Sequence, residues 1–162
     1  MTNTIDIICI LVLLSTCAGL IWTDMRHGLL PDWMNALVAA SGFVQEAASA
    51  DLPAALWDGA AAVAVGAALL LLRRLYVMVR GQQGLGLGDV KFLMAATLWA
   101  GLSGLPILLL IATLSALTAV LGLYITGRTL TGQTALPFGP FLVIGLLAVL
   151  LLQWTGELAM MI

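Results

Sequence analysis

Charged residues are scarce in this chain of 162 residues. Only 9% of the residues are Asp, Glu, Lys or Arg, against 62% hydrophobic residues, and the mean hydropathy is +1.14. A soluble domain normally has about a quarter of its residues charged, because it must present a polar surface to water. The scarcity of charge excludes an ordinary soluble domain and indicates an integral membrane protein.

Cysteine and histidine are nearly absent as well. The two cysteines, Cys9 and Cys17, lie in one apolar run and match no CxxC pattern, so they indicate small buried thiols. His27 is the single histidine, which excludes an HExxH zinc protease. The few Lys and Arg residues form no basic stripe, so the sequence gives no support for binding nucleic acid.

Apolar runs make up most of the chain, and six of them can be drawn. About twenty apolar residues cross the hydrocarbon core of a bilayer; the second and fourth runs are shorter than that. We predict an all-α membrane protein, a bundle of about six transmembrane helices forming one domain over residues 1–162. The first run should be a permanent helix, because no Lys or Arg precedes it. The runs are 5–22, 33–48, 52–72, 90–104, 105–125 and 138–154.

The positions of the cations predict the orientation in the membrane. With six helices, every Lys and Arg lies in or beside the loops that follow the first, third and fifth helices. The positive-inside rule then places these loops in the cytoplasm and both termini outside the inner membrane. The longest of these loops is expected over residues 73–88. The cations are Arg26, Arg73, Arg74, Arg80, Lys91 and Arg128.

Two acidic residues are predicted at the same membrane depth. Asp24 falls at the cytoplasmic end of the first helix, and Asp89 begins the fourth. Two neighbouring carboxylates do not both ionise easily, so one holds a proton near neutral pH. The ionised partner can take a proton from an attacking water, while the protonated partner donates to a peptide carbonyl. The spacing alone also fits an interfacial Asp24 and an Asp89 that stabilises a helix start.

The approach to Asp89 is rich in glycine. Residues 84–89 read GLGLGD, and alternating glycines let another backbone come close to the carboxylate. A flexible loop would read the same way. The run does not follow a strand and is not a Walker loop, so nucleotide binding is not supported.

Three motifs resemble the prepilin peptidases, which belong to the GxGD class of intramembrane aspartyl proteases. Residues 86–92, GLGDVKF, resemble the G-x-G-D-x-K signature of that family. Residues 24–32, DMRHGLLPD, resemble its first motif, an aspartate followed by an apolar-Pro-Asp/Asn turn. Residues 137–141, PFGPF, are similar to the proline-glycine turn that opens its last helix. The three motifs occur in the family's order across a matching six-helix layout, so the resemblance extends over most of the chain.

The resemblance implies that Asp24 and Asp89 are the catalytic pair. It also implies that the chain cuts the basic leader from type IV prepilin or pseudopilin precursors, at the cytoplasmic face of the membrane. Bifunctional members carry an insertion with paired CxxC motifs, which this sequence lacks. The chain therefore resembles the short peptidase-only branch that serves Flp/Tad-type pili. We expect no zinc, no S-adenosylmethionine and no methyltransferase activity; the partners are the precursor and membrane lipid, and the oligomeric state stays open.

Five further residues are expected to position the substrate: Gly86, Gly88, Lys91, Pro31 and Asp32. Lys91 equally fits an interface lysine whose ammonium group reaches the water, and Pro31 with Asp32 fits an ordinary helix start.

Two other functions of the whole chain also fit acidic residues buried in a membrane. One is a small proton-coupled transporter or channel subunit that uses the acids as a relay. The other is a structural assembly subunit in which both aspartates are replaceable.

Overall fold

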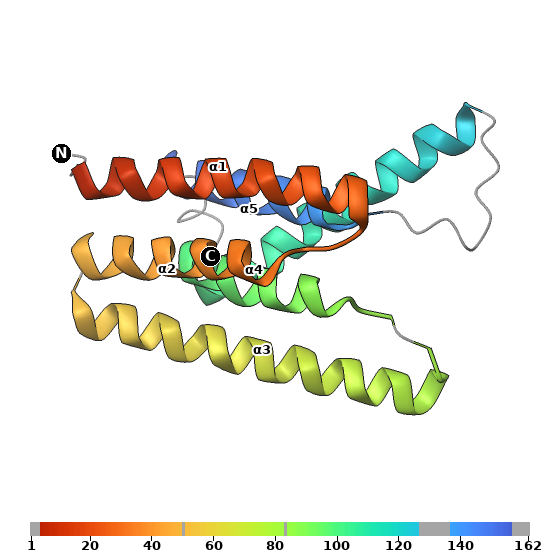
Figure 1. Cartoon of the computed structure of the whole chain (residues 1–162), viewed down its shortest axis with the longest axis horizontal. Helices are drawn as coiled ribbons and strands as arrows, with labels where there is room; N and C mark the ends of the chain where they lie inside the picture. The colour runs from red at the N-terminus through yellow and green to blue at the C-terminus, as the bar shows by residue number, and fades with distance from the viewer. Residues whose placement is uncertain (1–3, 50, 83, 127–136, 157–162) are drawn as a thin grey trace.

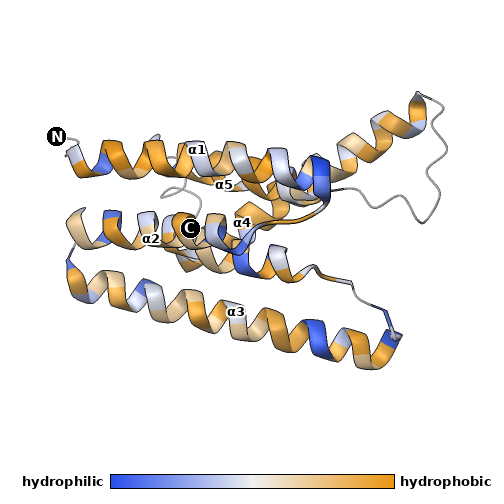
Figure 2. Cartoon of the chain, viewed as in Figure 1, coloured by the Kyte–Doolittle hydropathy of each residue, from blue (hydrophilic) through white to orange (hydrophobic). Residues whose placement is uncertain are grey.

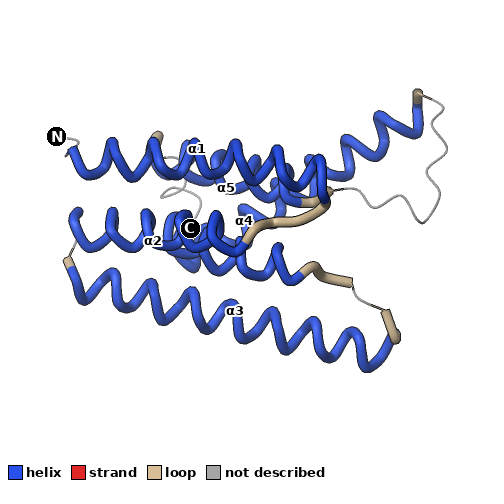
Figure 3. Tube along the Cα trace, viewed as in Figure 1, coloured by secondary structure: helices blue, strands red, loops and turns tan. Residues whose placement is uncertain are grey.

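The computed structural model of the chain describes residues 4–49, 51–82, 84–126 and 137–156. Every regular element within these ranges is an α-helix (Figure 3), so the predicted all-α class is confirmed. The predicted cytoplasmic cation Arg128 lies outside the described residues. The helices are α1 (Thr4–His27), α2 (Asp32–Ser49), α3 (Leu52–Arg80), α4 (Leu87–Ile125) and α5 (Gly139–Trp154).

Helix α3 is longer than the sequence predicted. Asp51 caps its start by accepting a hydrogen bond from the backbone N–H of Ala54 at 2.8 Å. The helix ends only at Gly81, whose φ of 67° is the left-handed conformation that glycine adopts most readily. The loop expected over residues 73–88 is therefore wrong in its first half, which continues α3 and carries its arginines as part of a helix.

Helix α4 consists of two helices joined at Gly101, where φ is 68° and ψ is 171°. The chain reverses there, and the second half runs back past the first (Figure 1). At the turn, the Ala100 carbonyl accepts a hydrogen bond from Gln153 Nε2 at 2.8 Å, near the end of α5. All six predicted runs are thus helical, but the boundary between the fourth and fifth lies at Gly101 and not at 104–105.

Helix α4 packs against three other helices, α2, α3 and α5. Small residues bring the backbones together: a side chain at Gly66 of α3 would overlap Met94 of α4. The Trp99 indole donates a hydrogen bond to the Val38 carbonyl of α2 at 2.9 Å. Phe92, in the same part of α4, is fully buried in the core. These contacts fix the position of the helix that begins at the GLGD motif.

The outer surface of the bundle is apolar. Large side chains such as Trp57 and Trp154 are 77% and 84% exposed, and hydrophilic residues gather toward the helix ends (Figure 2). By length and composition, α1, α3 and α4 can each cross a membrane, and α5 is a shorter apolar helix of 16 residues. An apolar surface of this extent suits lipid and not water. We call the end where α1 finishes and α2, α4 and α5 begin the site end.

Candidate active site

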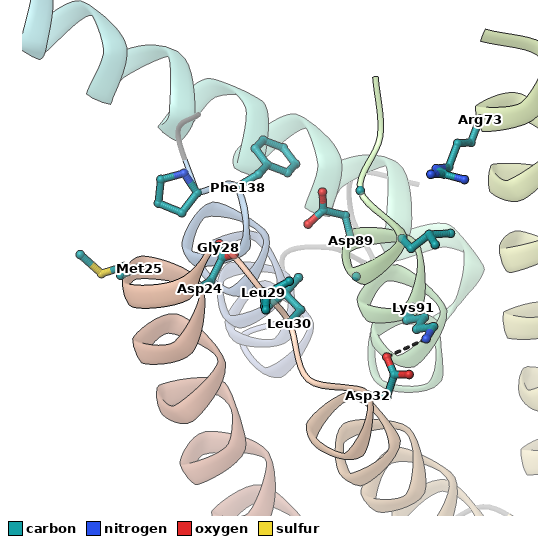
Figure 4. Close-up of a pocket in the computed structure, with 14 residues that line it drawn as sticks. Asp24, Met25, Gly28, Leu29, Leu30, Asp32, Arg73, Asp89, Lys91 and Phe138 are labelled. Carbon is teal, nitrogen blue, oxygen red and sulfur yellow. Dashed lines mark hydrogen bonds and ion pairs between the residues drawn. The ribbon is translucent and has the colours of Figure 1, made fainter. Parts of the chain in front are cut away.

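A cavity of about 640 Å³ opens at the site end of the bundle (Figure 4). Asp24, in the last turn of α1, and Asp89, in the first turn of α4, both line it. They are 65 positions apart in the sequence (89 − 24), so it is the fold that brings them to one cavity. Paired carboxylates in a shared cavity can carry out acid and base chemistry together.

The start of α5 holds Asp24 in place. This residue is only 7% exposed, and its Oδ2 accepts a hydrogen bond from the backbone N–H of Gly139 at 2.8 Å. Gly139 is the first residue of α5, and the first N–H groups of a helix favour a negative charge. A Cβ atom at Gly139 would lie 2.6 Å from that same oxygen. Glycine is needed here to let the carboxylate reach the helix end.

The GLGD turn encloses Asp89. This residue lies in the first turn of α4, three residues after Gly86, the N-cap residue of that helix. A Cβ atom on Gly86 would lie 2.9 Å from Asp89 Oδ2. Each aspartate therefore lies against the N-terminus of a different helix, Asp24 against α5 and Asp89 against α4. The figure shows the Asp89 side chain pointing into the space between α4 and α1 (Figure 4).

Leu30, in the loop between α1 and α2, sets the spacing of these two helix starts. A Cβ atom on Gly88 would lie 2.9 Å from Leu30 Cβ, and one on Gly139 would lie 3.0 Å from Leu30 Cδ2. The leucine is thus packed between α4 and α5. The loop leaves α1 through Gly28, which has a φ of 62° and donates its N–H to the Asp24 carbonyl at 2.8 Å. The sequence reasoning missed Leu30, because only the fold shows what its side chain fills.

Lys91 and Asp32 form an ion pair of 2.6 Å between α4 and α2. Both line the cavity, but the sequence analysis had weighed them separately. Their side chains are 45% and 74% exposed, and a pair this exposed contributes at most about 1 kcal/mol to stability. Its main effect is geometric, since it joins the starts of two helices beside the aspartates. Pro31 is not among the lining residues; its carbonyl accepts the N–H of Asn35 at 3.2 Å, in the first turn of α2.

Arg73 is a lining residue that the sequence reasoning did not select. It was assigned to a loop, whereas the structure places it on α3 and in the cavity wall. Its Nε donates a hydrogen bond to the Leu85 carbonyl at 2.9 Å, directly before the GLGD turn. This contact attaches the glycine-rich approach to α3. A signal was present in the sequence, since an arginine that follows an apolar run by one residue can extend the helix and reach back to polar backbone.

The fold and the site together define a helical membrane protein with two aspartates at helix ends that line one cavity. Known proteins with similar sequences identify the family of this chain. The type IV leader peptidase family matches residues 11–123. A prepilin leader peptidase/N-methyltransferase of Xanthomonas campestris pv. campestris is 35% identical over 123 residues, 75% of this chain and 42% of that protein. The leader peptidase HopD of Escherichia coli is 38% identical over 122 residues, 74% of this chain and 76% of HopD.

The chain belongs to the type IV leader peptidase family. A relative from Legionella pneumophila, also named prepilin leader peptidase/N-methyltransferase, extends the similarity to 90% of this chain at 32% identity, and 50% of its own length is covered. The chain thus spans half or less of the length of these N-methyltransferase relatives, and most of the length of HopD. No solved structure matches it.

Proposed function

We propose that this chain is an intramembrane aspartyl endopeptidase that removes the basic leader from type IV prepilin or pseudopilin precursors. The observation that carries the proposal is that Asp24 and Asp89 line the same cavity in a chain of the leader peptidase family. The cavity lies at a helix end and not in the middle of the bundle. A bond cut there would be one just outside the apolar part of a substrate helix.

The two carboxylates would divide the chemistry as a pair that shares one proton. One of them takes a proton from a water as that water attacks the peptide carbonyl carbon, and the other donates its proton to the carbonyl oxygen. The C–N bond of the resulting gem-diol intermediate then breaks. The departing amine takes a proton from the protonated carboxyl group, and the other carboxylate takes a proton from one hydroxyl as the carbonyl re-forms, so that the pair again holds one proton. Because the backbone of Gly139 binds Asp24 Oδ2, we assign Asp24 Oδ1 to the contact with water or substrate.

A cleavage assay tests this function. Purified protein in detergent is mixed with a precursor that carries a basic leader and an apolar helix, and mass spectrometry identifies both products. We expect release of the leader by a cut just ahead of the apolar helix. If the precursor stays intact while a bifunctional relative cuts it under the same conditions, the proposal is wrong.

We further propose that the chain cuts without methylating the new amino terminus. The support is the similarity over 76% of HopD, whose name mentions only a leader peptidase. With S-adenosylmethionine added to the same assay, the product is expected to keep an unmodified amino group. A methylated product would show that the two activities are combined in this chain.

We propose that the site end faces the cytoplasm, with both termini outside the inner membrane. Arg26 stacks on Trp22 at 4.1 Å in the last turns of α1, and arginines cluster at the end of α3, as the positive-inside rule requires.

Cysteine labelling tests this orientation, in a chain whose two native cysteines are replaced by alanine. Ser49→Cys, exposed at the end of α2, should react with an impermeant maleimide in intact cells whose outer membrane has been made permeable. Gln82→Cys, exposed after α3, should react only after the inner membrane is opened. The opposite labelling pattern would show that the chain has the inverse orientation in the membrane.

A further inference from the structure

A second cavity of about 310 Å³ begins where the catalytic cavity ends. Asp32 and Lys91 line both cavities, so the ion pair between them marks the boundary. From there the second cavity follows α2 as far as Ala39. Seven residues of helix at 1.5 Å each make it roughly 10 Å long. It leads away from the site end, toward the interior of the membrane-spanning bundle.

The walls of this cavity are built for a close approach. It lies between α2, α3 and α4, is almost wholly apolar, and includes small residues of all three helices; we call it the apolar groove. Ala36 of α2, Ala62 of α3 and Ala95 of α4 are among its lining residues. Small side chains at such positions let another backbone pack against a helix in a membrane. Roughly two turns of a helix would fit along its length.

Beyond the Asp32–Lys91 ion pair at its boundary, the groove has one further polar lining residue. Asn35 is 4% exposed, lines the groove, and has neither its Oδ1 nor its Nδ2 hydrogen-bonded within the described part of the chain. A buried amide without partners is costly and rare in native proteins. Its acceptor and donor together match a peptide unit, which offers one N–H and one C=O. The groove therefore contains a binding group without a ligand.

We propose that the apolar groove binds the first two turns of the substrate's apolar helix, on the far side of the cut bond, and that Asn35 pairs with its backbone. The proposal rests on the proposed function and adds to it the place where the helix lies. The first N–H groups of a helix have no partners within that helix, so they can reach Asn35 Oδ1. A lipid chain would fill the groove but would leave the amide of Asn35 unpaired. The basic leader then stays at the site end.

Two substrates of different length test this placement. One is a precursor with its complete apolar helix, and the other is a peptide that ends three residues after the cut bond. We expect the wild-type enzyme to prefer the long substrate in kcat/KM. Ala36→Phe, at an exposed position in the groove wall, should lower this preference about tenfold, mainly through a higher KM for the long substrate.

A matched control separates groove filling from the mere addition of a phenyl ring. Ala64 is also an exposed alanine, on α3, and it does not line the groove. Ala64→Phe should keep the wild-type preference. An unchanged preference in Ala36→Phe, or the same loss in both variants, would overturn the groove as the binding place.

Asn35→Leu tests the hydrogen-bonding part of the proposal. Leucine is close in size and removes the unpaired amide, so the variant should unfold at the same temperature as wild type or higher. Its preference for the long substrate should nevertheless fall about tenfold, the effect of one or two lost hydrogen bonds. If Asn35→Leu keeps the wild-type preference for the long substrate, Asn35 does not bind substrate.

The wild-type enzyme separates this proposal from the proposed function. If wild type cuts neither substrate, the proposed function is wrong. If wild type cuts both substrates equally well, only the groove proposal is wrong.

Discussion

Replacing Asp24 or Asp89 by asparagine should reduce precursor cleavage about a thousandfold, within the range that acid–base groups contribute. Asparagine has the shape of aspartate but neither takes up nor releases a proton near neutral pH. In Asp24→Asn, the side-chain oxygen can still accept the N–H of Gly139, so the first turn of α5 keeps its contact. The loss should therefore appear in kcat, with a nearly unchanged melting temperature.

Asp58→Asn provides the matched control for these variants. Asp58 is a partly buried acid of α3 that lies outside the catalytic cavity, and its variant should cut the precursor at the wild-type rate. Each variant is purified and assayed with the same precursor, and its unfolding is followed by circular dichroism. Normal processing by either Asp24→Asn or Asp89→Asn would rule out the paired-carboxylate mechanism. A structural subunit or a transporter would show no processing in wild type either.

The helical segments could be predicted because a bilayer imposes the length of each apolar run. Their ends could not, because single residues decide them. Helix α3 continues past its apolar run until Gly81 adopts the left-handed conformation. The reversal in α4 occurs at Gly101, three residues before the predicted boundary at 104–105, although Gly104 and Pro106 are also residues that interrupt a helix. Only packing against α5 shows which of the three makes the turn.

The two aspartates were predictable for a related reason. Helices that cross the same bilayer return to the same two levels, so Asp24 and Asp89 had to lie at one depth. The distance between the two aspartates in the plane of the membrane depends on which helices are neighbours, and the depth of each residue does not determine which helices these are. The same limit applies to the Lys91–Asp32 pair, which joins residues 59 positions apart, and to Asn35, which lines a groove between three helices. Leu30 occupies the apolar position of the first motif, but the motif does not show that its side chain packs against the starts of α4 and α5.

Gly139→Ala should lower kcat about a hundredfold, although the change adds only one methyl group. The new Cβ would lie 2.6 Å from Asp24 Oδ2 and 3.0 Å from Leu30 Cδ2, so the carboxylate or the start of α5 must move. Because Asp24 Oδ2 is hydrogen-bonded to the Gly139 backbone at 2.8 Å, that movement breaks or lengthens the bond that positions the carboxylate. A displacement of about 1 Å in a catalytic group commonly costs about a hundredfold in rate.

Gly122→Ala is the control for Gly139→Ala, because a Cβ atom at Gly122 would meet nothing within 4 Å. Alanine is the better helix former at an exposed helical position, so this variant should be as active as wild type and slightly more stable. Single-turnover cleavage at saturating precursor isolates the chemical step from substrate binding. A Gly139→Ala enzyme with the wild-type rate would show that Asp24 does not need its contact with α5. The melting temperature separates a folding defect from a catalytic one.

If Gly139→Ala melts at a lower temperature, the added Cβ destabilises the fold, and Gly139→Ser, which adds a Cβ at the same place, should also melt at a lower temperature. If Gly139→Ala is slower but melts at the wild-type temperature, the start of α5 positions Asp24 for catalysis.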